Sequence, residues 1–307
     1  MLPQYKNNIK IQSLLDLFIV CYVVISDLYN LFVPKSVKDR PGSQPHLSDA
    51  EVITIVIVGE LFGIDVEIRW YTLVKQNYLY LFPKLNERSR FNRRRRDLCQ
   101  VINLLRAKLI EILLDTDDPW RIIDSFPIVI ANWGRRSQVK VARDKGGYGI
   151  CSAKQLRFFG YRLHLLLTLE GLIVKCVLAP ANKSDITVAP EVLEGMLNLI
   201  LLGDAIYSSP PLVEEMKKSG ILMHVLVNSQ WHEALPEEVE KLIKRARCLI
   251  ETVGSQLTRV LHIETNWAKS ERGIESRILG KLLAHTIGFF LNSLAGNSPL
   301  KLASLIY

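Results

Sequence analysis

The sequence predicts an α/β protein in which a mixed sheet flanked by helices follows a helical N-terminal region. Helical periodicity dominates up to residue 114, β-rich runs begin near residue 120, and strands then alternate with helices. A strand that returns through a helix runs parallel to its predecessor, whereas the hairpin expected at Glu170-Gly171 is antiparallel. The sheet is therefore expected to be mixed.

An acidic stretch that ends in Pro119 divides the chain. We expect a helical, basic region over residues 1–114 and a second domain, which contains the sheet, over residues 119–294. The 307 residues are enough for two such domains, each with its own core.

The first helix is expected within residues 13–33, a strongly apolar run. Asp16 and Asp27 leave ten uncharged residues between them, which is fewer than the roughly 20 that a membrane span needs. We therefore expect a buried helix and no membrane association.

The next helices carry clear start and stop signals. Ser48 with Glu51 three residues later forms a capping-box pattern, and Gly63 is expected to close that helix. A further helix follows and is expected to end by Pro83.

The net charge of +8 favours an acidic partner, nucleic acid before an anionic membrane surface. The five cysteines form no CxxC pair, so we expect neither a disulfide framework nor a zinc site, and a reducing, cytoplasmic setting. Residues 84–114 concentrate the positive charge, including Arg93, Arg94, Arg95 and Arg96. Such a cluster suits phosphate contacts, although the charge alone fits a solvated helix face equally well.

The second half begins with a β-rich run over residues 120–132 that is interrupted at Asp124. The hairpin of residues 160–182 follows, and the run LILLGD forms a later strand that ends on Asp204. Helices are expected on either side of the strand ILMHVLV, and a long helix is expected to start at Pro236 and to run to residue 261.

Acidic side chains are the main candidates for a functional site. Asp124 and Asp204 both lie at expected strand ends, where sites in α/β sheets tend to form. Two carboxylates about 4 Å apart repel by roughly 4 kcal/mol, so the pair favours a cation, and Mg²⁺ suits oxygen ligands, with Mn²⁺ as a substitute. Glu251 on the long helix is the expected third ligand, and Arg247 lies one turn before it.

Two further polar residues have more than one interpretation. Ser184 or Asp185 is expected to cap a helix, with catalysis as the alternative for Asp185. His164 lies on the strand face opposite Leu163 and Leu165, either beside the metal site or in solvent. The absence of GxxxxGK[ST], GxGxxG and GxSxG patterns argues against nucleotide-binding and serine-hydrolase classes.

Several motifs resemble the DDE transposases of bacterial insertion sequences, most closely the insertion sequence 982 family. They are IDSFP at Asp124, FFGYRLHLLLTLEG over 158–171, LAPAN up to Asp185, LLGD at Asp204 and IETVGSQL at Glu251. The segments LSDAEVITI and LFPKLNERSRFNRR in the N-terminal half resemble that family as well, so the resemblance spans roughly residues 45–292.

The resemblance implies a ribonuclease H-like catalytic domain with the acidic triad Asp124, Asp204 and Glu251, and an N-terminal helical DNA-binding region. It also implies two magnesium ions, double-stranded DNA with terminal inverted repeats and a target DNA as substrates, and a homodimer or higher oligomer on DNA. The implied location is the bacterial cytoplasm, at the nucleoid when the protein is active. Expected DNA contacts are made by Arg93–Arg96, Arg247 and Arg259.

Two departures from the family pattern leave other functions open. Ala205 and Ile206 replace the basic residue and glycine that commonly follow the second aspartate, and Thr258 stands where many DDE enzymes carry a lysine. A catalytically inactive or domesticated DNA-binding protein, or a ribonuclease H-like nuclease, are the alternatives to an active transposase.

Overall fold

The computed structural model describes residues 10–39, 42, 45–151, 155–225, 237–265 and 267–305. The chain forms two compact units, one made of Met1–Leu113 with Gln256–Tyr307 and the other of Leu114–Ser255. We call them the helical unit and the sheet unit. The division between the units falls at residue 114, and residues 256–294, which were expected in the second domain, group with the helices of the first half.

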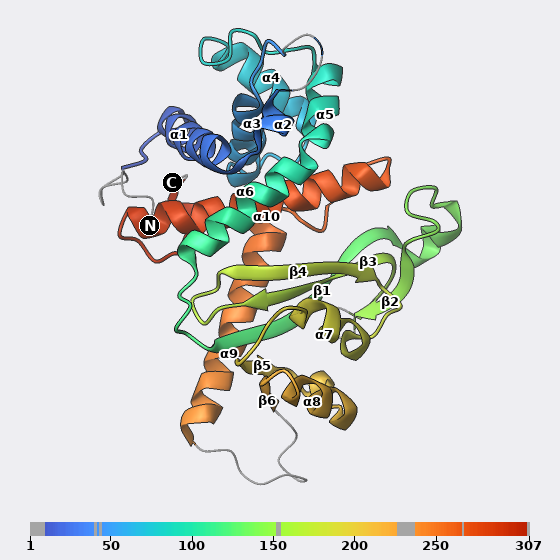
Figure 1. Ribbon diagram of the computed structural model, residues 1–307. Coiled ribbons are helices and arrows are strands. Elements are labelled where there is room, and N and C mark those ends of the chain that lie inside the picture. Colours follow the sequence, from blue (N-terminus) through green and yellow to red (C-terminus); the bar gives the residue numbers. More distant parts are fainter. Residues whose placement is uncertain are drawn as a thin grey trace. The chain divides into compact units, whose positions relative to one another are not determined.

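In the helical unit, α10 packs on α3 and α6, and α1 packs on the same two helices (Figure 1). Nearly every side chain of α3 is buried, because other helices cover it on several sides. The helices are α1 (Leu14–Phe32), α2 (Lys35–Lys38), α3 (Asp49–Leu61), α4 (Glu67–Asn77), α5 (Arg88–Asp97), α6 (Cys99–Leu113) and α10 (Glu271–Leu294), with a π-helical segment at Gln256–Val260 and a 3-10 turn at Leu302–Leu305.

The predicted capping box of α3 is present. The Ser48 side chain accepts a hydrogen bond from the Glu51 backbone N–H, and the Glu51 carboxylate accepts one from the Ser48 N–H at 2.6 Å. Gly63 follows the helix with a φ of 72°, a conformation that favours glycine. The sequence signals for this helix are therefore confirmed.

Helix α1 covers most of the apolar run of residues 13–33, and Ser13 caps it. One face, which includes Leu17, Phe18 and Cys21, is buried, while Ile19 and Leu31 are exposed. Among the helices that the structure describes, α1 is the one long and apolar enough to cross a membrane by length and composition.

A buried network of ion pairs links three helices of the helical unit. Glu60 of α3 is 7% exposed and accepts hydrogen bonds from Lys281 of α10 and, at 3.0 Å, from Arg95 of α5. Although burial works in the opposite direction, Lys281 and Arg95 hold the pKa of Glu60 below its usual value. Nearby, Arg277 of α10 pairs with Asp65 in the α3–α4 loop. The network therefore fixes α5 and α10 against α3.

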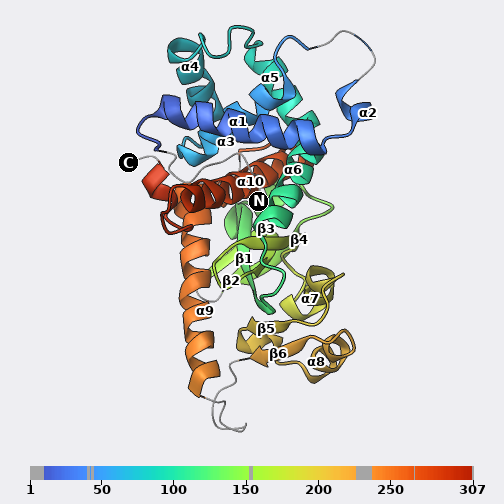
Figure 2. The same cartoon turned by 60° about the vertical axis from the view of Figure 1, so that its left-hand side comes forward.

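The sheet unit contains a six-stranded mixed sheet in the order β2-β3-β1-β5-β6, and β4 also pairs with β3. β1 is antiparallel to β3 and parallel to β5, and β5 is parallel to β6. Helix α9 contacts β1 and β5 on one face, and α7 and α8 lie on the other (Figures 1 and 2). The elements are β1 (Trp120–Asn132), β2 (Gly147–Cys151), β3 (Leu156–Leu167), β4 (Ile173–Pro180), α7 (Asp185–Leu193), β5 (Ile200–Gly203), α8 (Pro210–Lys217), β6 (Leu222–Val225) and α9 (Glu237–Ser255).

The mixed α/β class is confirmed, with two differences in detail. β1 continues through Asp124 instead of breaking there, because residues 122–129 pair without interruption with β3. The strand β2 was not predicted. Its glycines carry no side chain where Phe158 and Asn182 approach the backbone closely. The predicted start of the long helix at Pro236 lies outside the described residues.

We expect Glu60→Gln to destabilise the helical unit by about 3–5 kcal/mol, because it leaves Lys281, 1% exposed, and Arg95 without their buried carboxylate. Urea unfolding measures this loss. The double variant Glu60→Gln/Lys281→Met should recover part of it. The control Glu111→Gln, which breaks the exposed pair with Lys108, should cost less than about 1 kcal/mol. Equal effects of the two glutamate changes would contradict a structural role for the network.

Candidate active site

Asp124 and Asp204 occupy equivalent positions on adjacent parallel strands. Ile122 of β1 pairs with Leu202 of β5, and each aspartate stands two residues further along its strand. β5 ends at Gly203 while β1 continues, so Asp124 lies where its neighbouring strand stops. The register thus places the two carboxylates next to each other at the carboxyl end of β5, where ligand sites of α/β sheets are found.

The two aspartates differ in their surroundings. Burial, together with the charges of Asp185 and Asp204, raises the pKa of Asp124 from 3.8 to about 6, even though a backbone hydrogen bond at Ser125 and the charge of Arg162 favour the ionised form. Asp204 is exposed. Its carboxylate accepts hydrogen bonds from the Ala205 N–H at 2.7 Å and from Arg247 at 3.0 Å.

Helix α9 carries both Arg247 and Glu251, one turn apart, along the β1 and β5 face of the sheet. The Arg247–Asp204 contact joins this helix to the tip of β5. In the described part of the chain, Arg247 makes no ion pair with Glu251, which is exposed. No group of three or more His, Cys, Asp or Glu side chains among the described residues is arranged to hold a metal ion. Glu251 thus lies on the long helix, as predicted, but it does not form a group of metal ligands with other acidic side chains in the described structure.

Asp185 is the acid that sequence reasoning underestimated. Ser184 is the N-cap of α7, because its hydroxyl accepts a hydrogen bond from the Thr187 N–H. Asp185 is 5% exposed and accepts a hydrogen bond from the Ser125 hydroxyl, and Arg162 lies 3.6 Å from its other oxygen. Ser125 follows Asp124 directly, so a partly buried hydrogen bond holds the chain next to the central carboxylate.

His164 and Tyr207 also lie beside these acids. His164 pairs across the strands with Ser125 and is fully buried, so the solvent alternative for it is wrong. Its Nδ1 is 3.4 Å from Asp185 without forming a hydrogen bond, and burial lowers the pKa of the ring, which favours neutral histidine. The buried hydroxyl of Tyr207 has no hydrogen-bond partner among the described groups. Burial, and then the charges of Asp185 and Asp124, raise its pKa.

The register of β1 against β3 could have indicated this second cluster, which consists of Ser125, His164 and Asp185. Alternation places Ser125 and His164 on the same face of the sheet as Ile123 and Leu166, which form part of the core beneath α7 and α8. Asp124 has the opposite orientation, towards the α9 face. The site therefore has two sides, with Asp124 on one and the Asp185 cluster on the other.

The predicted DNA-contacting arginines differ in their environments. Arg94 pairs with Asp49, and Arg95 is buried and pairs with Glu60. In α5, Arg93 is exposed and Arg96 is half-buried. Arg259 is exposed in the π-helical segment.

We expect Asp124→Asn to stabilise the protein at pH 8 in the absence of metal. The raised pKa means that the folded protein disfavours the ionised carboxylate, so stability is lost as pH rises from about 4 through 6. The displacement from 3.8 to about 6 corresponds to about 3 kcal/mol. Thermal unfolding at pH 4 and pH 8 in EDTA measures the effect. The difference should vanish near pH 4, and the exposed control Asp144→Asn should show none at either pH. A pH-independent difference for Asp124→Asn would contradict this.

Comparison with known proteins places these residues in one family. The family described as Transposase DDE domain matches residues 116–271, about half of the chain, and the match contains Asp124, Asp185, Asp204 and Glu251. No curated protein matches the chain. A cryo-EM structure of the piggyBac transposase synaptic complex with hairpin DNA is similar with 10% identity and a TM-score of 0.36 over 76% of this chain and 54% of that chain. The chain thus spans about half the length of that protein. The family match over residues 116–271 shows that the chain belongs to the Transposase DDE domain family.

Proposed function

We propose that the protein is a metal-dependent DNA transposase that cuts and joins the ends of its element through a ribonuclease H-like sheet unit. The observation that supports this most directly is the parallel register of β1 and β5, which aligns Asp124 with Asp204 beside the helix that carries Glu251. The family match spans all three acids. In this proposal the three carboxylates are the metal ligands.

The chemistry of the donor set fits Mg²⁺, with Mn²⁺ as a substitute, because the candidate ligands are all carboxylate oxygens. The half-buried Asp124 is the strongest indication. Its pKa is raised where burial and two neighbouring acids disfavour its charge, and a bound cation would favour that charge. A pair of such ions lowers the pKa of a bound nucleophile and stabilises the oxygen that leaves a phosphodiester.

Arg247 forms an ion pair with Asp204 at 3.0 Å. Both side chains are more than half exposed, so the pair contributes less than about 1 kcal/mol and gives way easily to a metal ion. Released from Asp204, Arg247 would be free to contact a DNA phosphate near Glu251. In this proposal, Arg247 pairs with Asp204 until a metal ion binds, and Arg247 is not itself a metal ligand.

Asp185 has a positioning role in the proposed site. It holds the Ser125 hydroxyl on the opposite face of β1 and contributes negative charge next to Asp124. Because Arg162 and Ser125 already engage its oxygens, it is less available to a metal than the exposed Asp204.

The remaining features follow from the resemblance to the insertion sequence 982 family. We propose terminal inverted repeats and a target site in double-stranded DNA as substrates, a homodimer or higher oligomer on DNA, and action in the bacterial cytoplasm at the nucleoid. Arg93–Arg96, Arg247 and Arg259 stay the proposed DNA contacts, with Arg93, Arg247 and Arg259 exposed and so the most accessible of them.

A catalytically inactive DNA-binding descendant is the second candidate. The observation that favours it is the surface after Asp204, where Ala205 and Ile206 are exposed and Ile206 presents 49% of its surface. An apolar side chain there cannot replace the basic residue common in related transposases. Metal-dependent cleavage separates the two candidates, and joining of a DNA 3′-hydroxyl separates a transposase from a nuclease.

We expect purified protein with Mg²⁺ to cleave DNA carrying the ends of its element. Asp124→Ala, Asp204→Ala and Glu251→Ala should each lower the rate by at least about a hundredfold, because each removes a charge that holds the metal. Gel analysis of end-labelled DNA measures both cleavage and joining. The control Asp144→Asn, an exposed acid in the same unit, should retain the wild-type rate. Full activity in any of the three alanine variants would exclude that residue from the triad.

We expect Asp185→Asn to move the acidic limb of the cleavage profile to lower pH. Metal binding needs ionised Asp124, so activity falls as pH drops through about 6. Removing the neighbouring charge of Asp185 lowers the pKa of Asp124 and extends activity into more acidic solution. Rates measured between pH 5 and 8 at a subsaturating Mg²⁺ concentration give the profile, because protons then compete with the metal for Asp124. A large loss at every pH, with weaker Mg²⁺ binding in calorimetry, would instead make Asp185 a ligand.

A further inference from the structure

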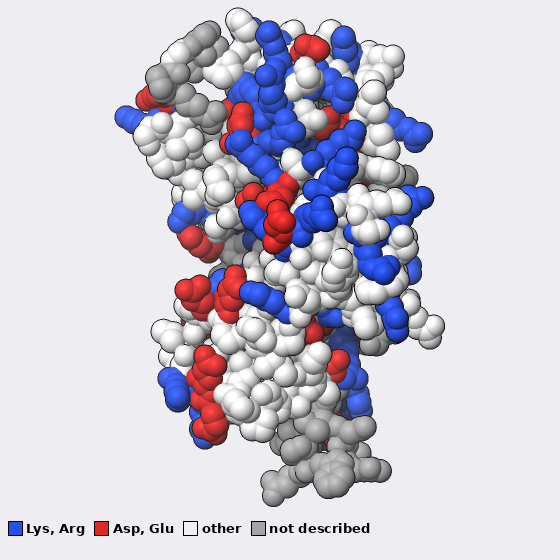
Figure 3. Space-filling view, turned by 90° about the vertical axis from the view of Figure 1, so that its right-hand side faces the viewer, with Lys and Arg blue, Asp and Glu red and all other residues white. Residues whose placement is uncertain are grey.

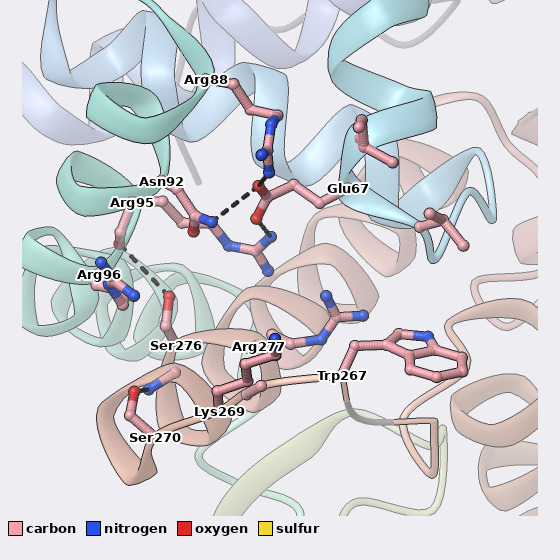
Figure 4. Close-up of a pocket in the computed structure, with 14 residues that line it drawn as sticks. Glu67, Arg88, Asn92, Arg95, Arg96, Trp267, Lys269, Ser270, Ser276 and Arg277 are labelled. Atoms are coloured by element: carbon pink, nitrogen blue, oxygen red, sulfur yellow. Dashed lines mark hydrogen bonds and ion pairs between the residues drawn. The ribbon is translucent and has the colours of Figure 1, made fainter.

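The helical unit contains a cavity of about 700 Å³ that the acidic site does not use. Its walls come from the start of α4, the middle of α5 and the segment that leads into α10 (Figure 4). All lining residues belong to the helical unit, whereas Asp124, Asp204 and Glu251 belong to the sheet unit. The cavity is therefore a separate feature, and its volume is in the range of small-ligand sites.

The cavity wall is strongly positive. Five lining residues are basic and one, Glu67, is acidic. Arg88 lies 3.6 Å from Glu67, and Arg95 is engaged by Glu60 behind the wall. The basic residues are Arg88, Arg95, Arg96, Lys269 and Arg277. Arg96 and Lys269 form no ion pair within the described ranges, so their charges are not neutralised by the protein. Figure 3 shows that Lys and Arg side chains also gather over the helical unit, the upper part of that view.

Two buried donors at this wall lack partners. The Nε groups of Arg95 and Arg277 have no hydrogen-bond acceptor among the described atoms, and the two residues are only 6% and 8% exposed. Figure 4 shows both guanidinium groups turned towards the middle of the cavity. A buried donor without a partner costs about 1–3 kcal/mol, so the protein keeps these two guanidinium groups at the wall without satisfying all of their donors.

The N-terminus of α10 opens on the same cavity. Ser270 caps this 24-residue helix, and Ser270 and Gly273 both line the wall. The partial positive charge of a helix N-terminus favours anions. The exposed ring of Trp267 lines the same cavity. Cationic side chains, buried donors and a helix N-terminus thus converge on one space.

We propose that this cavity binds a phosphate of the DNA backbone and anchors the DNA at a second point away from the acidic site. Arginine presents a planar fork of donors that matches phosphate oxygens, and an ammonium group adds a compact charge. The contacts are Arg96, Lys269 and the α10 N-terminus, with Arg95 and Arg277 as the buried wall. The choice of DNA as the source of the phosphate rests on the proposed function, but the binding itself needs no metal.

Fluorescence anisotropy with a labelled DNA duplex in EDTA tests this proposal. Arg96→Ala and Lys269→Ala should each weaken binding about tenfold and lower the salt dependence by about one phosphate contact. The matched control is Arg90→Ala, which removes an exposed arginine of the same helix outside the cavity and should change the affinity less than about twofold. Equal effects of Arg96→Ala and Arg90→Ala would overturn the proposal.

Two further measurements identify the ligand and the cause of any loss. Arg96→Lys should recover most of the affinity, whereas a folding defect would appear in the thermal melts of Arg96→Ala. Millimolar inorganic phosphate should protect the wild type against thermal unfolding more than it protects Arg96→Ala. If phosphate protects in this way but DNA affinity is unchanged in both alanine variants, the cavity is a site for a small anion and the DNA assignment fails.

The DNA-binding measurements in EDTA test the cavity independently of catalysis. Asp144→Asn, which changes an exposed acid of the sheet unit, should bind DNA in EDTA with wild-type affinity, because its carboxylate is not part of the cavity. Weaker binding in the cavity variants without any Mg²⁺-dependent cleavage by the wild type would support the cavity and reject the transposase. Normal binding in those variants together with triad-dependent cleavage would do the reverse.

Discussion

The parallel pairing of β1 with β5 is the constraint on which the sheet unit depends. β1 is the central strand, hydrogen-bonded to β3 on one side and to β5 on the other, so its position is fixed from both edges. Because β5 stops at Gly203, Asp124 has no strand neighbour on that side, and Asp204 follows directly after the end of β5. A shift of the register by one residue would turn the two carboxylates to opposite faces of the sheet.

The position of the central carboxylate, Asp124, lowers the stability of the protein but suits the binding of a cation. Partial burial and two neighbouring acids disfavour the charge of Asp124, and the raised pKa of Asp124 expresses that cost. Despite this cost, the hydrogen bond between Ser125 and Asp185 on the other face of the sheet holds β1 in place. The charge of Asp124 is thus unfavourable in a position where a bound cation would stabilise it. Such perturbed pKa values are characteristic of functional sites.

In the helical unit, buried charges serve two purposes at once. Glu60 neutralises Lys281 and Arg95, which allows α5 and α10 to pack closely on α3. The same arrangement leaves the Nε group of Arg95 without a partner at the cavity wall. The arginine-rich helix is therefore neither a simple solvated face nor a uniform DNA-binding surface. Arg94 and Arg95 are held by ion pairs inside the unit, whereas Arg93 is exposed and Arg96 is half-buried, because successive helix positions point in different directions.

The sequence by itself determined much of the local structure and the position of Asp204 directly after its strand. The capping box at Ser48 and the hairpin at Glu170-Gly171 were predictable because neighbouring residues set them. Only the tertiary structure decided the rest. The fully buried His164, the role of Asp185 in holding Ser125, and the assignment of residues 256–294 to the helical unit all depend on contacts between distant segments. Local periodicity carries no information on such contacts, because burial and pairing across a sheet are properties of the folded chain and not of any single segment.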